Sequence, residues 1–137
     1  MTDYFGAMGT ALYSALSGGT LLITELGGTA VYAEQAPDGA ALPYVVFSHQ
    51  GGGPQNITHS NLHDNVWFVR GYAGTRAQAN RIDGLVEGLL HRKTLTVSGY
   101  TNFWTVRTES VALIENPPSG TKVYMSGGLY QIRLTGA

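Results

Sequence analysis

Two histidines and an aspartate form the chain's best candidate for metal chemistry. His59 and His63 are four residues apart, and Asp64 follows the second histidine. On a helix this spacing would direct two imidazoles at one metal ion, as in a small metal-dependent hydrolase. The surrounding residues have no helical periodicity, and a catalytic zinc site also needs a third ligand and a positioned water. The pattern favours polar residues leading into a strand, and a metal-dependent hydrolase remains the remote alternative.

A run of glycines resembles a phosphate-binding loop in composition only. A P-loop needs a lysine and a serine or threonine that open a helix, and the residues after the glycines supply neither. We therefore interpret Gly51, Gly52, Gly53 and Pro54 as a flexible loop.

Nucleophilic and paired-carboxylate catalysis are not supported either. The sequence has no Gly-x-Ser-x-Gly motif. Ser48 and His49 are neighbours on a predicted strand, so their side chains would point to opposite faces. Asp83 and Glu87 are predicted to lie on a solvated helix face near Arg76. We predict no catalytic residues, no metal and no cofactor, and hence no enzyme.

The amino-acid composition argues against several further classes of protein. The 137 residues include 19 glycines and no cysteine, only 12% are charged, and the formal net charge is −1. A near-neutral chain lacks the basic surface of a free-standing DNA-binding protein, and the missing cysteines exclude disulfide scaffolds and thiolate metal sites. Residues 4–24 carry no charge, but their glycines and hydroxyl groups argue against a membrane span or a signal peptide.

The pattern of apolar residues predicts one α+β domain over residues 1–137. The clearest element is a main helix over 75–92, in which apolar residues recur every three or four positions from Ile82 to Leu90 and Thr75 is the N-cap. An N-terminal helix is predicted over 3–16, strands within 31–72, and C-terminal strands within 94–134, beginning with a hairpin whose turn lies near Asn102. Residues 20–26 fit either a short helix or a loop. This order predicts a mostly antiparallel twisted sheet with two helices packed on it.

One stretch of the chain resembles a known family. The run VYAEQAPDGAALPYVVF at 31–47, and the last strand with YQIRL at 130–134, resemble the phage tail-completion or tail-terminator family. The order of elements between these two segments is also similar to that family, in which a minor tail protein lies at the head-tail joint of long non-contractile tails. The triple glycine at 51–53 is a departure from it.

The resemblance implies a structural protein of the virion, assembled in the bacterial host cytoplasm. It implies a homo-oligomeric ring, typically of six subunits, that caps the tail tube, stops its polymerisation and joins the head. The implied partners are the tail tube protein, a head-completion or neck protein, and double-stranded DNA that passes through the lumen without sequence readout. No membrane is implied. The alternative is a head-closure or adaptor protein of the neck.

Ring closure would require a heterologous interface, in which two different patches meet. Aromatic side chains in a lightly charged chain suit such interfaces. We therefore predict subunit or tube contacts at two exposed tips, the hairpin turn and the proline loop. Their residues are Tyr100, Asn102, Phe103, Trp104, Pro117 and Pro118.

Overall fold

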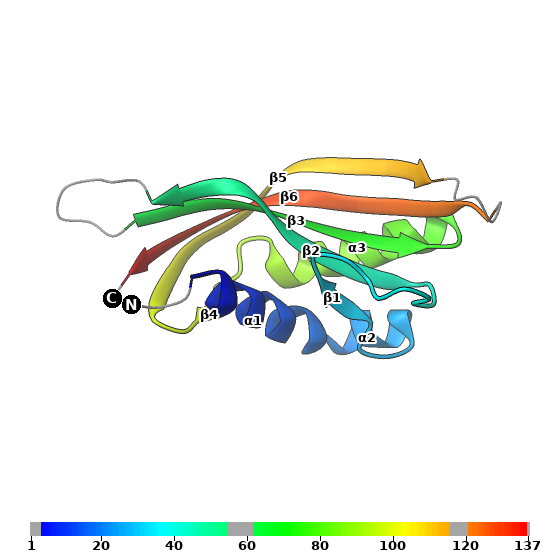
Figure 1. Ribbon diagram of the computed structural model, residues 1–137, viewed down its shortest axis with the longest axis horizontal. Helices are drawn as coiled ribbons and strands as arrows, with labels where there is room; N and C mark the ends of the chain where they lie inside the picture. The colour runs from blue at the N-terminus through cyan, green and yellow to red at the C-terminus, as the bar shows by residue number, and fades with distance from the viewer. Residues whose placement is uncertain (1–3, 55–61, 116–120, 137) are drawn as a thin grey trace.

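The computed structural model describes residues 4–54, 62–115 and 121–136. These residues form three helices and six strands (Figure 1). In chain order the elements are α1 (Tyr4–Ser17), α2 (Thr20–Leu26), β1 (Val31–Ala33), β2 (Tyr44–Pro54), β3 (Leu62–Ala73), α3 (Arg76–Leu90), β4 (Thr96–Val97), β5 (Tyr100–Glu115) and β6 (Val123–Gly136).

The strands form one mixed sheet in the order β1-β2-β3-β6-β5-β4. β1 runs parallel to β2, and every other neighbouring pair is antiparallel. Parallel neighbours need a longer connection than a hairpin turn, and residues 34–43 supply it. The prediction of an α+β fold with a mostly antiparallel sheet is thus correct in outline, and the parallel edge strand β1 corrects it.

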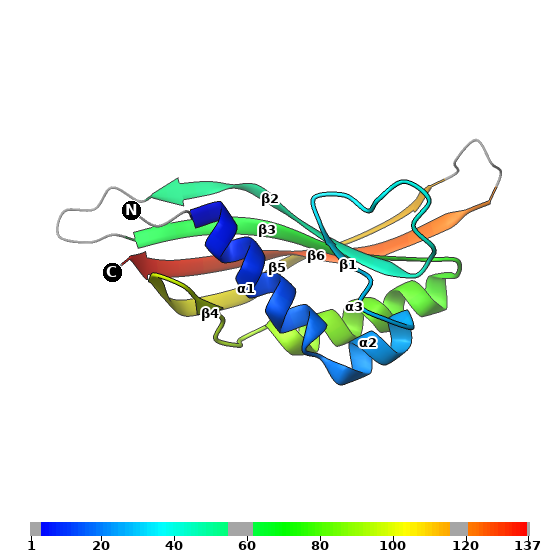
Figure 2. The same cartoon turned by 60° about the horizontal axis from the view of Figure 1, so that its bottom comes forward.

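All three helices lie on one face of the sheet (Figures 1 and 2). Alternate residues of β3 point to that face, so Trp67 and Val69 are buried there together with Tyr130 and Ile132 of β6. The helices add Leu12, Leu16, Ile82, Val86 and Leu90 to the same core. Burying a side chain of this size contributes about 1.5–3 kcal/mol, so this layer holds the helices on the sheet.

The main helix is close to its predicted bounds. α3 spans Arg76–Leu90, and the Thr75 hydroxyl oxygen accepts a hydrogen bond from the Gln78 amide at 3.2 Å. This side-chain cap satisfies one of the amides that a helix start leaves without a partner. The predicted N-cap is therefore confirmed.

The chain has one helix more than the two predicted. Residues 20–26 form α2, which ends where Gly27 adopts a φ of 77°. The Gly28 amide then donates to the carbonyl of Ile23 at 3.1 Å, which closes the helix end. Within the described residues no helix has the length and apolar character needed to cross a membrane.

The glycine run belongs to a strand, which overturns the predicted flexible loop. Gly51 to Pro54 continue β2 and pair with β3, in the register Gly52 with Asn65. Gly52 has a φ of 94°, and a Cβ there would collide with the backbone carbonyl of Asp64. Backbone pairing requires no side chain, so a neighbouring strand orders a segment that cannot pack by itself.

The first C-terminal hairpin turns earlier than predicted. Its turn lies at Ser98 and Gly99, where Gly99 has a φ of 81°, and Val97 pairs with Tyr100. The predicted break near Asn102 is instead a bulge inside β5, where the register against β6 shifts. The hairpin therefore consists of the short strand β4 and the long strand β5, which continues through the bulge to Glu115.

Candidate assembly surfaces

Asn102, one of the predicted interface residues, is a buried structural residue. It is only 5% exposed, and its Oδ1 accepts hydrogen bonds from the Leu95 amide at 2.8 Å and the Thr105 hydroxyl at 3.0 Å. Its Nδ2 donates to the carbonyls of Trp104 at 3.1 Å and Arg133 at 3.0 Å. Both ends of the amide are used inside the chain, so the prediction of an interface role for Asn102 is wrong.

Phe103 and Trp104 are accessible at the bulge of β5, where Phe103 is the residue without a partner in the register. Phe103 is 51% exposed and Trp104 is 43% exposed. The Arg133 guanidinium lies 5.4 Å from the Trp104 ring centroid, a cation–π contact that orients the indole. These two side chains are placed where a neighbouring molecule could contact them, and their role in an interface remains a prediction.

Tyr100 lies in an aromatic cluster rather than at a free tip. Its ring is half-buried and meets Tyr4 at 5.8 Å and His63 at 5.3 Å, both edge-on. Tyr4 stacks on His63 at 5.4 Å, and burial raises the pKa of Tyr4 to about 12. The cluster ties the start of α1 to the sheet. Pro117 and Pro118 lie outside the described residues.

The candidate metal ligands do not converge where they are described. His63 and Asp64 are consecutive on β3, so they point to opposite faces of the sheet. His63 stacks on Tyr4, whereas Asp64 accepts from Gln131 at 2.9 Å and pairs with Arg133 at 3.4 Å. His59 lies outside the described part of the chain. Within that part, no group of three or more His, Cys, Asp or Glu side chains could hold a metal ion.

The polar face of α3 was predicted to be solvated, but its charged side chains Asp83 and Arg76 bond to the sheet. Asp83 pairs with Arg107 of β5 at 2.8 Å, and the two side chains are 18% and 8% exposed. Burial alone would lower the pKa of Arg107, but the Asp83 carboxylate outweighs it and the pKa is raised. Arg76 donates to the carbonyls of Met125 at 2.8 Å and Leu113 at 2.9 Å. These arginines fix β5 and β6 to α3.

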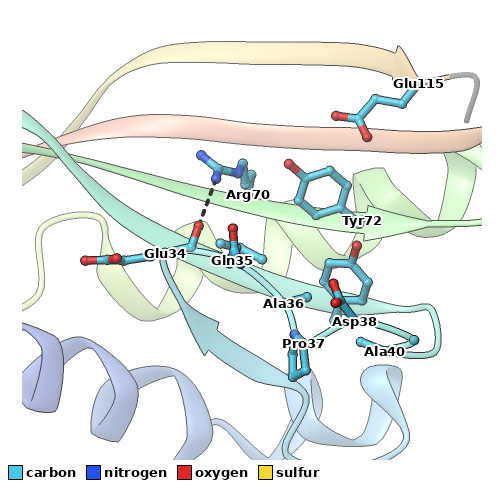
Figure 3. Close-up of a pocket in the computed structure, with 12 residues that line it drawn as sticks. Glu34, Gln35, Ala36, Pro37, Asp38, Ala40, Arg70, Tyr72 and Glu115 are labelled. Atoms are coloured by element: carbon cyan, nitrogen blue, oxygen red, sulfur yellow. Dashed lines mark hydrogen bonds between the residues drawn. The ribbon is translucent and has the colours of Figure 1, made fainter.

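A polar pocket lies between the loop 34–43 and the strands. It has a volume of about 380 Å³, and Figure 3 shows its side chains. The Arg70 guanidinium donates to the Glu34 carbonyl at 3.5 Å and to the Ser48 hydroxyl at 3.3 Å, while its buried Nε has no partner. The lining residues are Glu34, Gln35, Ala36, Pro37, Asp38, Gly39, Ala40, Tyr44, Val46, Arg70, Tyr72 and Glu115.

The pocket carries more negative than positive charge. Three carboxylates line it, from Glu34, Asp38 and Glu115, against the single guanidinium of Arg70. In Figure 3 the Glu115 carboxylate is directed toward Tyr72. Burial raises the pKa of Tyr72; the positive charge of Arg70 opposes the rise and the negative charge of Glu115 adds to it. The arrangement suits a cationic or hydrogen-bonding group from another molecule.

Large apolar side chains are also exposed on two projecting parts of the molecule. Leu113 and Ile114, near the end of β5, are 51% and 53% exposed, and Leu21 on α2 is 72% exposed. Leu21 borders a groove of about 310 Å³ between α2 and α3, where Gly84 and Gly88 leave open space. Such surfaces are typical of proteins that assemble with partners.

Comparison with known protein families decides which class of protein carries these surfaces. Residues 10–123 match the family described as tail completion protein gp17. The chain belongs to this tail completion protein family. Tail completion proteins of this family are structural components of bacteriophage virions, which agrees with the family resemblance of the sequence. No individual curated protein matches the chain significantly.

Solved structures show the same fold for this tail completion protein. A chain in the virion of a native gene transfer agent particle superposes with a TM-score of 0.81 at 18% identity, covering 99% of this chain and 100% of that one. The bacteriophage SPP1 gp17 protein superposes with a TM-score of 0.53 at 22% identity, covering 96% of this chain and 90% of that one. At these identities the likeness establishes the fold.

The sequence does not predict the pocket, which is a markedly polar surface feature of this tail completion protein. Its pattern indicates only a turn at Ala36 to Gly39, and nothing local shows that the turn folds over β2 and β3. One signal is present in the sequence. Glu34 precedes the turn and Asp38 lies within it, and no basic residue is near them in the sequence.

Proposed function

We propose that this tail completion protein is a tail terminator that forms a hexameric ring on the last ring of the tail tube. The ring stops tube polymerisation and presents the surface to which the head-completion or neck protein of the filled head binds. Family membership over residues 10–123 carries this proposal, because it makes the chain a structural protein of the tail.

The surfaces of the molecule support an assembly role. A ring needs two different patches on each subunit, so that one patch meets the other on the neighbour. The chain offers the exposed aromatic pair Phe103 and Trp104 on β5 and, elsewhere, the polar pocket under loop 34–43. The formal net charge of −1 and the low share of charged residues suit a conduit through which DNA slides without being held.

Tail length tests the proposal directly. The gene is deleted in a particle-producing strain, and tails in the lysate are measured by negative-stain electron microscopy, with the wild-type gene supplied in trans as control. Overlong tubes without heads are expected, because only loss of the polymerisation stop lengthens a tube. Tails of normal length that lack heads would instead identify a neck adaptor, and normal particles would contradict both roles.

A further inference from the structure

Three arginines of this lightly charged protein are neutralised within the chain. They lie on α3, β5 and β6, and each forms an ion pair with a carboxylate. The pairs are Arg81 with Glu25 at 2.9 Å, Arg107 with Asp83 at 2.8 Å and Glu87 at 4.0 Å, and Arg133 with Asp64 at 3.4 Å. Charged side chains outside such pairs can form ion pairs with a partner molecule, so their positions indicate where a partner would bind.

Two of the remaining carboxylates lie at the edge of the sheet that carries β1. Glu34 follows β1 directly, and Asp38 belongs to the loop 34–43 that connects β1 to β2. Both are exposed, and neither has an ion-pair partner among the described residues. Together with Glu115 they border the polar pocket, in which Tyr44 and Tyr72 add two phenol groups (Figure 3). We call Glu34, Asp38 and the loop 34–43 that carries Asp38 the acidic edge; Glu115 lies on β5, across the sheet from them.

Two of the remaining cations lie at the opposite edge. Arg92 and Lys93 follow α3 in the connection to β4, the last strand at the other end of the sheet. Both are exposed, and within the described part of the chain neither forms an ion pair with a carboxylate. They border a surface depression that also includes Phe103 and Trp104. We call this surface the basic aromatic edge.

The backbone at these edges is only partly covered. On the outer side of β5 the Thr105 carbonyl accepts from the Arg92 amide at 2.7 Å, and the Arg107 amide donates to His91 Nδ1 at 3.1 Å. β4 pairs only with Tyr100 and Thr101, so most of the long strand β5 has no strand on its outer side among the described residues. β1 covers only Val45 to Phe47 of β2, which leaves the rest of that strand open as well. Natural proteins usually protect long edge strands, so partly open edges on both sides favour a contact with another chain.

We propose that the acidic edge of one copy of this chain binds the basic aromatic edge of the next copy, with Arg92 and Lys93 facing Glu34 and Asp38. The two edges carry opposite charge and lie at opposite edges of one sheet. A contact between unlike patches on opposite sides of a subunit is heterologous, and repeating it produces a closed ring or a filament. The proposal rests on the proposed ring and names the surfaces that would build it.

Charge reversal on each edge tests this pairing in the full-length protein. One variant carries Glu34→Lys and Asp38→Lys, and the other carries Arg92→Glu and Lys93→Glu. Self-association is measured by sedimentation equilibrium, and copy number is measured in particles from a deletion strain supplied with each variant. Each variant alone is expected to associate about tenfold more weakly than wild type, because like charges then meet at the interface.

Mixing the two variants distinguishes pairing from general damage. In a one-to-one mixture the reversed acidic edge of one variant meets the reversed basic edge of the other, so association is expected to return. Lys122→Glu is the charge-reversal control, since Lys122 is exposed, precedes β6 and lies outside the pocket and the depression. The control is expected to associate like wild type.

The outcomes separate this inference from the proposed function. A ring that assembles undiminished from either variant, or a mixture that fails to recover, would overturn the edge pairing and leave the ring intact. A wild-type chain present as one copy per particle would overturn the ring and the pairing together.

Discussion

Arg107 on β5 and Asp83 on α3 form a two-point ion pair beneath the sheet. Nη1 of the arginine donates to Oδ1 at 2.9 Å, and Nη2 donates to Oδ2 at 2.8 Å. Nη2 also donates to the Gly127 carbonyl at 2.9 Å, and Nη1 to the Tyr130 hydroxyl at 3.3 Å. One guanidinium therefore joins β5, β6 and α3, the elements that present the exposed end of β5.

Replacing Asp83 by alanine is expected to lower the free energy of unfolding by about 3 kcal/mol, because the largely buried guanidinium of Arg107 loses its counter-charge. Urea unfolding of the variant measures the loss. Glu87→Ala is the matched control: its side chain is 48% exposed and 4.0 Å from Arg107, so the expected loss is under about 1 kcal/mol. Equal losses in the two variants would contradict a dominant role for the Asp83 pair.

Asn102→Ala is expected to destabilise the fold by about 2 to 4 kcal/mol, because the Leu95 amide and the Arg133 carbonyl lose their partner in the interior. Thermal and urea unfolding measure the effect. Phe103→Ala, next to it on β5 and 51% exposed, is expected to cost less than about 1 kcal/mol. If both variants unfolded like wild type, Asn102 would not be a structural residue of β5.

The sequence predicts those elements whose determining residues lie within one short segment of the chain. α3 is recovered almost to the residue because the spacing of Ile82, Val86 and Leu90 and the cap at Thr75 all lie within one segment. Gly51 to Gly53 form a strand only because β3 lies beside them, and no local pattern carries that fact. The same holds for Asn102, whose partners Leu95 and Arg133 lie on other segments.

Among the candidate surfaces, too, what depends on local sequence could be predicted and what depends on tertiary contacts could not. Exposed aromatics at Phe103 and Trp104 could be predicted, because aromatic residues clustered in a lightly charged hairpin are typical of protein interfaces. The acidic edge could not be predicted, because it depends on how the loop 34–43 folds over the sheet to bring Asp38 near Tyr72. That fold is set by tertiary contacts between segments far apart in sequence.

Alkaline pH is expected to destabilise the protein through Tyr130. Burial raises the pKa of this tyrosine from 10.0 to about 12, so the folded state keeps a proton that the unfolded state releases. The contribution of this raised pKa to the free energy of unfolding is fully present below pH 10. It falls by about 1.4 kcal/mol per pH unit as the pH rises toward 12. Urea unfolding at successive pH values measures the slope. Tyr130→Phe is expected to reduce the slope, and an unchanged slope would exclude Tyr130 as its source.

Two glycine-to-alanine substitutions are expected to change the free energy of unfolding in opposite directions. A Cβ at Gly71 of β3 would lie 2.5 Å from the Ile82 side chain of α3, so Gly71→Ala is expected to cost about 1–3 kcal/mol. A Cβ at Gly84 meets nothing within 4 Å, so Gly84→Ala is expected to gain about 0.5–1 kcal/mol from helix propensity. Urea unfolding of the two variants gives the comparison. A loss of stability in Gly84→Ala would show that the surface of α3 is crowded at this position.

Trp104→Ala is expected to weaken self-association by about tenfold or more while leaving the fold intact, because large aromatic side chains dominate the binding energy of interfaces. The Trp104 side chain contributes little to the stability of the fold. It is 43% exposed, and its cation–π contact with Arg133 is worth about 0.5–1 kcal/mol. Tyr13→Ala on α1 is the matched control, because Tyr13 is 44% exposed and belongs to neither edge. Sedimentation equilibrium measures association and urea unfolding measures stability. Equal association of the two variants would remove Trp104 from the interface, whereas a selective loss in Trp104→Ala would locate the contact on the basic aromatic edge.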